Sequence, residues 1–328
     1  MTRQIRALTI AALAAAAPLF TPVAAQAANL TLCGASPGGL WSLLGVGLDA
    51  AVREADPGST VTYQTSSGGF ANIVQLKSGA CDLAIVHAGE VIIAERGDAP
   101  FKEPTGGIAT VALMYDKAPM HWLMGKEFAD KYSISSIADI APAEAPMSFV
   151  SNRAGILPAI LAEESLKAVG LDYEALEGFG GNVQYEGSSG AAEVMQDRKA
   201  DMWANATFVG TGAVNAIANA RDVTLLSVPD EVIADMVERY GSEEVTIEAG
   251  AYDWLDHDVK TFGARALLVA AEDADPETIK LVAGAIRDHA DKIAEVHGAM
   301  GAYTADFAAS FDVLPYHPAA AEAMGITQ

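Results

Sequence analysis

Positive charge is scarce in this sequence. The 328 residues contain 20 Lys and Arg against 43 Asp and Glu, which gives a formal net charge of −23. Nucleic-acid binding relies on clustered Lys and Arg that neutralise phosphates, so the composition argues against a nucleic-acid partner. It does not exclude an anionic ligand, because a local group of hydrogen-bond donors outweighs a distant, screened surface charge.

Cysteine is scarce as well. Cys33 and Cys81 cannot form a structural zinc site alone, and no clustered histidines stand near them. An oxidising compartment would favour a disulfide. However, Cys33 falls near the end of the first expected strand, and Cys81 lies just before the third. In a parallel sheet these ends lie on opposite sides, beyond the roughly 7 Å that a bridge allows between Cα atoms. This geometry argues against a bridge.

Catalytic motifs are also lacking. The sequence has no Gly-x-Ser-x-Gly elbow, no His-Glu-x-x-His and no nucleophile beside an obvious base. Its first glycine-rich turn is not followed by Gly-Lys-Ser/Thr, and glycines 34, 38 and 39 lack the spacing of a dinucleotide-binding turn. We therefore predict a protein that is not an enzyme and that has no cofactor and no metal site.

The first 27 residues have the three-part pattern of a secretory signal peptide. Arg3 and Arg6 precede an apolar run over 7–20 that is too short to anchor in a bilayer, and the segment ends in Ala25-Gln26-Ala27. The alternative is an N-terminal helix of the domain, but an alanine-rich run without a polar face makes a poor surface helix. We predict cleavage after Ala27 and export to a bacterial periplasm.

Beyond this segment, short apolar strands alternate with helical patterns, which is typical of the α/β class. The expected strands are 30–33, 61–65, 82–86, 108–115, 121–124, 148–150, 183–185, 201–204, 223–228 and 262–271. We predict a two-lobed type II periplasmic-binding-protein fold with a ligand cleft between the lobes. Its expected parts are 28–121 (lobe 1, first part), 122–264 (lobe 2) and 265–328 (lobe 1, return segment).

Three turns rich in Gly and Ser follow strands and lead into helices, at 34–39, 66–69 and 151–155. Ligands of open α/β sheets bind at the carboxyl ends of the strands, and the N–H groups that begin a helix receive anions. Each turn alone could serve only to reverse the chain, but three turns from two lobes favour a ligand site. The candidates in the first two turns are Ser36, Gly38, Gly39, Ser66, Ser67 and Gly69.

Arg153 lies in the third of these turns and is the candidate for binding an acidic group. A guanidinium grips a carboxylate by two parallel hydrogen bonds. The alternative is a surface Arg paired with an acid such as Glu186. Further candidates at strand ends or helix starts could wall a pocket or hydrogen-bond a ligand: Trp41, His87, Asn205 and Thr207. Tyr252, which follows Ala249-Gly250-Ala251, is another possible hydrogen-bond donor. Aromatic residues such as Trp41 could equally belong to the core.

The order of several segments resembles the solute-binding proteins of TRAP transporters, in the TAXI subfamily. The resemblance covers nearly all of the chain after residue 27. It rests on the glycine-rich first turn with an aromatic residue after it and on five further segments. These are Thr65-Ser-Ser-Gly-Gly-Phe-Ala-Asn72, Leu76-Lys-Ser-Gly-Ala-Cys-Asp-Leu-Ala-Ile-Val86, Ile134-Ser-Ser-Ile-Ala-Asp139, Ala249-Gly-Ala-Tyr252 and Leu314-Pro-Tyr-His-Pro-Ala-Ala-Ala321.

The resemblance implies a fold that closes on its ligand, TRAP membrane permease subunits as partners, and a small carboxylate such as glutamate or 2-oxoglutarate as the ligand. We expect a monomer. The sequence departs from the family at the expected pocket, in Cys33-Gly-Ala-Ser-Pro-Gly-Gly-Leu-Trp41 and Asn152-Arg-Ala-Gly155, so the ligand could differ from the familiar ones. Two alternatives share the fold. One is an ABC-importer binding protein for a sulfonate-like or amine-containing molecule, and the other is a deaminase-like or synthase-like enzyme.

Overall fold

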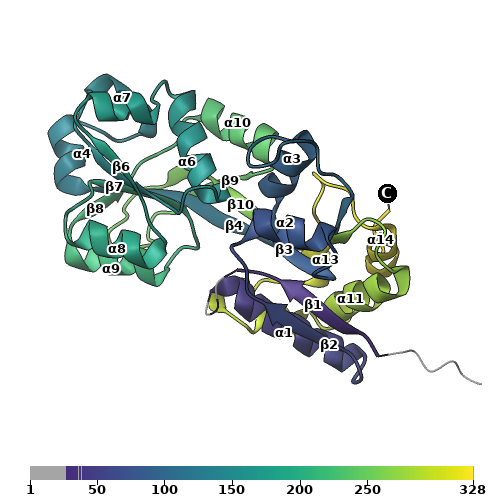
Figure 1. The fold of residues 1–328 in the computed structure, drawn as a ribbon. Helices are drawn as coiled ribbons and strands as arrows, with labels where there is room; N and C mark the ends of the chain where they lie inside the picture. Colours follow the sequence, from purple (N-terminus) through teal and green to yellow (C-terminus); the bar gives the residue numbers. More distant parts are fainter. Residues whose placement is uncertain (1–26, 36, 38, 328) are drawn as a thin grey trace, which may run out of the picture.

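The computed structural model describes residues 27–35, 37 and 39–327, which form two α/β lobes (Figure 1). The predicted fold class is confirmed by this arrangement. The predicted signal peptide, apart from Ala27, and the candidates Ser36 and Gly38 lie outside the described residues. Among the helices of the described ranges, none is long and apolar enough to cross a membrane.

The first lobe is built on three parallel strands in the order β2-β1-β3. Strand β10 follows, antiparallel to β3, and then β4, antiparallel to β10. Its strands are β1 (Asn29–Cys33), β2 (Thr60–Gln64), β3 (Leu83–His87), part of β4 (Ile108–Gly125) and part of β10 (Val259–Ala271). Its helices are α1 (Leu40–Ala55), α2 (Gly69–Lys77), α3 (Ala88–Arg96), α11 (Pro276–Asp288), α12 (Ala290–Ala294), η2 (Gly298–Met300), α13 (Ala305–Ala308) and α14 (Pro318–Met324). His289 separates α11 from α12.

The second lobe repeats this plan, with parallel strands in the order β7-β5-β6 and the rest of β4 antiparallel to β7. Its strands are β5 (Ser148–Ser151), β6 (Asn182–Tyr185), β7 (Met202–Ala206) and β8 (Val223–Leu225), which also pairs with β4. Its helices are α4 (Lys126–Tyr132), η1 (Ile137–Asp139), α5 (Ile140–Ala143), α6 (Leu157–Ala168), α7 (Tyr173–Gly178), α8 (Ser188–Gln196), α9 (Gly212–Ala220) and α10 (Asp230–Tyr240). Strand β9 (Glu243–Ile247) pairs with β10.

Strands β4 and β10 connect the two lobes. The sequence predicted two strands over 108–115 and 121–124, whereas β4 is continuous over 18 residues and is buried except at Asp116 and Lys117. It pairs with β10 in the first lobe and with β7 and β8 in the second. The pairing of β4 with β10 shifts register near Ala264, where the chain passes between the lobes. The lobe limits predicted at 121/122 and 264/265 fall inside these strands and stay a prediction.

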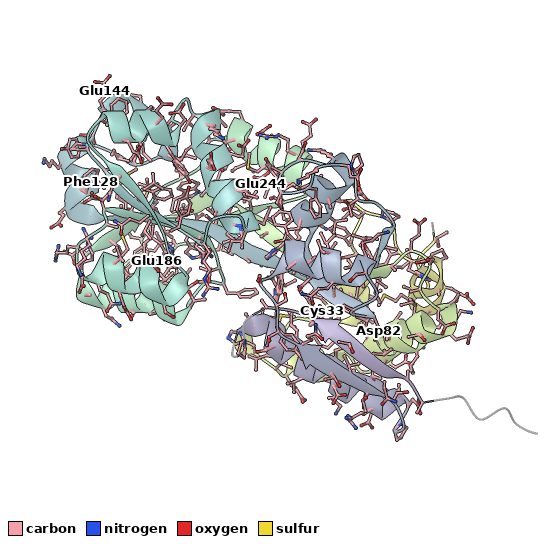
Figure 2. The ribbon with its side chains drawn as sticks, in the orientation of Figure 1. Cys33, Asp82, Phe128, Glu144, Glu186 and Glu244 are labelled. Carbon is pink, nitrogen blue, oxygen red and sulfur yellow. A yellow bond between two sulfur atoms is a disulfide. The ribbon has the colours of Figure 1, made fainter. Side chains whose placement is uncertain are left out.

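Apolar clusters surround each sheet, and one of them extends from the second lobe to Phe70 and Ile93 of the first. The largest fully buried side chains, Trp122, Trp203, Phe149 and Phe262, belong to the clusters around the second sheet. Figure 2 shows Phe128 and Glu186 on this lobe, with Cys33 and Asp82 on the other. Helix α3 of the first lobe packs on α10, and a Cβ at Gly89 would lie 3.0 Å from both Leu157 and the Tyr240 carbonyl. Glycine there lets the two lobes approach closely on this side.

Cys33 and Cys81 form a disulfide, so the argument against a bridge was wrong. That argument placed the start of β3 at the far end of the sheet from Cys33. In the structure β3 is displaced along β1, and Cys33 lies beside Ala84. The Thr31 N–H donates to Asp82 Oδ2 (2.7 Å), and the Asp82 N–H donates to the Thr31 carbonyl (3.0 Å). These bonds bring Cys81 to a Cα–Cα distance of 5.9 Å from Cys33, within the range for a bridge.

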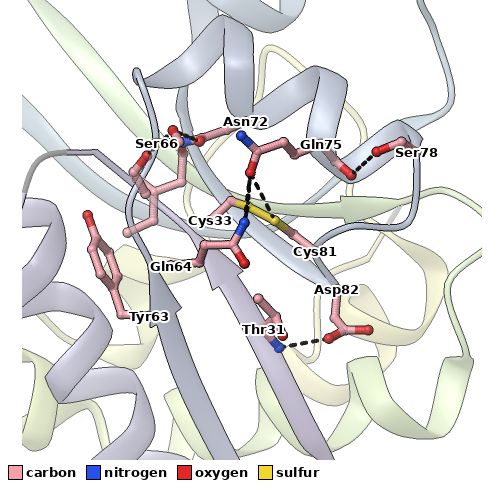
Figure 3. The surroundings of a disulfide bond; sticks show 12 residues. Thr31, Cys33, Tyr63, Gln64, Ser66, Asn72, Gln75, Ser78, Cys81 and Asp82 are labelled. Atoms are coloured by element: carbon pink, nitrogen blue, oxygen red, sulfur yellow. Dashed lines mark hydrogen bonds between the residues drawn. A yellow bond between two sulfur atoms is a disulfide. The ribbon is translucent and has the colours of Figure 1, made fainter.

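The disulfide lies at the carboxyl end of β1, directly before the first glycine-rich turn. Figure 3 shows Gln64 and Gln75 beside it. The Gln64 Nε2 group donates to Gln75 Oε1 (3.1 Å), which links the end of β2 to α2. The bridge therefore fixes the start of the turn that follows Cys33.

We predict that the oxidised protein shows no reactive thiol when it is denatured and two after reduction. Replacing both cysteines (Cys33→Ser with Cys81→Ser) should lower the free energy of unfolding by about 2–4 kcal/mol, because the bridge closes a loop with a sequence separation of 48. Thiol titration and urea unfolding measure the two effects. Two reactive thiols in the oxidised protein would contradict the assignment.

Candidate functional site

A cavity of about 360 Å³ lies between the lobes, within the size range of small-ligand sites. Six parallel strands, three from each lobe, have their carboxyl ends at it: β1, β2 and β3 from the first lobe and β5, β6 and β7 from the second. Strand ends are the usual ligand-binding edge of an open α/β sheet. Because both sheets present that edge to the same space, a ligand there contacts both lobes.

Three helices begin at this cavity with glycine as the N-cap residue. Gly39 precedes α1, Gly68 precedes α2 and Gly187 precedes α8, and no side chain caps any of them. The first N–H groups of a helix have no partner inside the helix and, together with the helix dipole, favour an anion. Gly68 has a φ of 110°, a conformation that other residues rarely adopt. The cavity is therefore surrounded by backbone donors.

Arg153 lies in the turn after β5 and lines the cavity from the second lobe. The predicted alternative, an ion pair with Glu186, is absent, and no acidic side chain in the described ranges pairs with Arg153. Its guanidinium lies against Gly187, where a Cβ would come within 3.2 Å of Arg153 Nε. Among the cavity's described lining residues, Arg153 is the single Lys or Arg. It is thus placed to meet an acidic group of a ligand.

Amide and hydroxyl groups continue this wall of the second lobe. Asn152 Nδ2 donates to Asn205 Oδ1 (2.6 Å), and Asn205 Nδ2 donates to Ser188 Oγ (3.4 Å). These residues come from the ends of β5 and β7 and the start of α8, and all three line the cavity. The chain of bonds orients the Asn152 and Asn205 amides, so this wall presents fixed polar groups.

Aromatic side chains form much of the first-lobe wall. Trp41 Nε1 donates to the Tyr115 hydroxyl (3.0 Å), which lies 3.3 Å from His87 Nε2. Because an indole only donates, the Tyr115 oxygen accepts that bond and its own proton is available to a neutral His87 Nε2. Burial raises the pKa of Tyr115 far above its usual range, so its hydroxyl stays protonated. Phe208, from the segment after β7, lies with its ring 5.1 Å from that of Tyr115.

Tyr252 does not line the cavity, contrary to its selection as a ligand contact. The Gly210 N–H donates to its hydroxyl (3.1 Å), which lies 2.8 Å from His121 Nε2, and His121 Nδ1 lies 2.9 Å from the Pro119 carbonyl. The side chain is buried and ties the segment after β7 to strand β4. Its place after Ala249-Gly250-Ala251 suggested a pocket, but its bonds give it a supporting position behind one.

Ser66 is also removed from the main cavity. Its hydroxyl donates to the Gly34 carbonyl (2.6 Å) and accepts from the Gly68 N–H (3.0 Å), and it also contacts Asn72. These bonds join the first two turns. Ser66 lines an adjoining depression that Arg153 also lines.

The structure brings together most of the described candidates. Those that line the cavity are Gly39, Trp41, Ser67, Gly69, His87, Arg153, Asn205 and Thr207. Sequence reasoning missed five further polar or aromatic lining residues, which are Glu90, Tyr115, Asn152, Ser188 and Phe208. The rule that ligands bind at the carboxyl ends of parallel strands could have identified Asn152, Ser188 and Phe208, since each follows such a strand within a few residues. Across the described ranges, no cluster of three or more His, Cys, Asp or Glu is arranged to hold a metal ion.

Comparisons with known proteins agree with this architecture. The family model described as the NMT1-like family matches residues 32–323. No curated protein matches the chain. Three similar solved structures share its fold at low sequence identity. PhnD1 from Prochlorococcus marinus, in complex with methylphosphonate, is 11% identical with a TM-score of 0.55, and the match covers 83% of this chain and 89% of PhnD1.

The other two similar structures are a little more alike in sequence. MatC from Rhodopseudomonas palustris, with bound malate, is 15% identical with a TM-score of 0.51, and the match covers 86% of this chain and 90% of MatC. The periplasmic binding protein BugD is 15% identical with a TM-score of 0.51, and the match covers 84% of this chain and 87% of BugD. At these identities the likeness shows the fold, which is the two-lobed fold of periplasmic binding proteins.

We predict that acid lowers the free energy of unfolding because of His121, which contacts Tyr252 behind the cavity. Burial lowers the pKa of His121 to about 4, against about 6.5 in an unfolded chain. Between these pH values the unfolded chain binds a proton that the folded chain does not. The free energy of unfolding should therefore fall as the pH drops from about 6.5 to about 4, by up to about 1.4 kcal/mol per pH unit from this group.

Urea unfolding across this pH range measures the effect, with His121→Gln beside His257→Gln as a control. His257 is exposed and pairs with Asp256. The His121 substitution should flatten the pH dependence, and the His257 substitution should leave that window nearly as it is. An equal pH dependence in wild type and His121→Gln would contradict the role assigned to His121.

Proposed function

The chain belongs to the NMT1-like family, and on this premise we propose that it is a solute-binding protein of a membrane transporter. In this proposal it is exported to the periplasm by its N-terminal signal, captures a small organic acid between its lobes and delivers it to a permease. The resemblance in sequence to the TAXI subfamily supports a TRAP permease as that partner. The predicted ligand is a carboxylate of the glutamate or 2-oxoglutarate kind, and the protein performs no catalysis.

One observation carries the proposal: the cavity collects donors for an anion in a chain that is otherwise strongly acidic. The glycine-capped starts of α1, α2 and α8 and the guanidinium of Arg153 all border it. With a net charge of −23, these donors are a local exception to the charge of the whole chain. The fold accommodates anions, since two of the similar structures hold malate and methylphosphonate.

The position of the donors also supports closure of the lobes on the ligand. Arg153 and the start of α8 belong to the second lobe, and the starts of α1 and α2 belong to the first. An acid that contacts both sets binds better when the lobes are close together, and this difference in affinity favours the closed arrangement. A permease could then distinguish the loaded protein from the empty one by its shape.

We predict that Arg153→Ala weakens the binding of organic acids by about 10- to 100-fold, because a hydrogen bond to a charged group contributes roughly 1.5–3 kcal/mol. A thermal-shift screen of carboxylates, sulfonates and phosphonates identifies the acid, and isothermal titration calorimetry measures its affinity. The screen also separates a carboxylate receptor from a receptor for sulfonate-like anions.

Arg198→Ala provides the matched control, because Arg198 is an exposed arginine of the same lobe that pairs with Glu127 (2.9 Å) and does not line the cavity. Its affinity for the acid should equal that of wild type. Stabilisation of the protein by uncharged compounds alone would contradict the proposal. Unchanged acid binding in Arg153→Ala would remove Arg153 from the site.

A further inference from the structure

The first-lobe wall of the cavity contains a carboxylate that an anion receptor does not need. Glu90 lines the cavity, yet the residue is only 2% exposed. One of its oxygens, Oε2, accepts a hydrogen bond from the His87 N–H (2.7 Å) at the start of α3 and lies 3.3 Å from His87 Nδ1. No Lys or Arg in the described ranges pairs with it. His87 is thus the neighbouring side chain that could carry a positive charge, and burying a carboxylate is costly unless a cation or hydrogen-bond donors compensate its charge.

Capping of α3 explains only part of this arrangement. A Glu at the third position of a helix commonly bonds the N–H of the cap residue, but such a role does not require burial beside a cavity. Gly69, the first residue of α2, leaves room for this carboxylate, since a Cβ there would lie 1.6 Å from Glu90 Oε2. Helix α3, which carries Glu90, and the start of α2 at Gly69 thus both place the carboxylate at the cavity wall.

The aromatic residues of the same cavity are also suited to a cation. Trp41, Tyr115 and Phe208 line the same cavity, with the Trp41 ring 5.0 Å from that of His87 and the Tyr115 ring 5.1 Å from that of Phe208. Aromatic rings attract ammonium groups, and cages of aromatic side chains bind alkylated ammonium ligands. A carboxylate and an aromatic wall are independent observations, and both indicate positive charge in the ligand.

Arg153 and the glycine-capped helices border the same cavity and indicate negative charge. We infer that the ligand is a zwitterion, an organic acid that also carries a positively charged nitrogen, and that Glu90 selects for this nitrogen. The inference rests on the proposed function, which supplies the acid. It adds a second requirement that a plain dicarboxylate does not meet.

Titration calorimetry with matched pairs of compounds tests this assignment. The pairs share an acid and differ in the nitrogen: butyrate with 4-aminobutyrate and its N-trimethyl derivative, glutarate with L-glutamate, and ethanesulfonate with 2-aminoethanesulfonate. In whichever series binds, wild-type protein should prefer the nitrogen-bearing compound by about tenfold or more. This comparison requires no variant and does not depend on the folding of one.

Glu90→Gln keeps the size of the side chain and an acceptor for the His87 N–H but removes the charge. It should lower the affinity for the nitrogen-bearing compound by about tenfold or more and change that for the plain acid by less than about threefold. Glu95→Gln is the control, since Glu95 lies on the same helix, is exposed and does not line the cavity. It should match wild type with both compounds.

The outcomes separate the two proposals. If plain acids bind as tightly as their nitrogen-bearing partners, or if Glu90→Gln weakens both equally, the inference fails while the proposed function stands. If no acid of either kind binds, both fail. A wild-type preference for the nitrogen that is lost only in Glu90→Gln supports both.

Discussion

The pairing of β4 with β10 is the constraint on which the rest of the structure depends. Strand β4 pairs with strands of both sheets, and its hydrogen bonds to β10 hold the two segments that pass between the lobes side by side. Because the pairing continues across the crossing region near Pro119 and Gly263, the two sets of parallel strands end toward a common space. Without these shared strands, the turns that follow the strands would be unrelated surface loops.

Local dipoles, rather than net charge, decide what this space can bind. A chain with a net charge of −23 repels anions at long range, but that repulsion is screened over about 10 Å in salt. Within the cavity, helix starts and a single guanidinium face inward at short range. Glu90 and the aromatic wall lie on the first lobe, which also contributes the starts of α1 and α2. The cavity is therefore bipolar, and this property favours ligands that carry both signs of charge over simple anions.

The sequence was sufficient to predict the fold class and most of the strand ends, because apolar periodicity and glycine-rich turns are local signals. Eight of the ten described candidate residues line the cavity, whereas Tyr252 and Ser66 do not. Tyr252 is a supporting residue because its hydroxyl is used by Gly210 and His121. Such a network joins three distant segments, and no local pattern reveals it.

The remaining errors have the same origin in long-range geometry. Glu90 was missed because its place beside Gly69 depends on how α3 packs against α2. Tyr115 was missed because it lies within an apolar strand, and its contacts with Trp41 and His87 join segments that are distant in the sequence. The disulfide was misjudged because the displacement of β3 along β1 is set by the Thr31 and Asp82 bonds, and strand order alone does not determine it.

The most direct test of this account is a crystal structure of the protein with the acid that stabilises it most. The account predicts that the ligand lies between the lobes, with its acidic group within hydrogen-bond distance of Arg153 and of first-turn N–H groups of the glycine-capped helices. It predicts contacts from both lobes in the same complex. An acid bound elsewhere on the surface, or held by one lobe alone, would contradict the central claim.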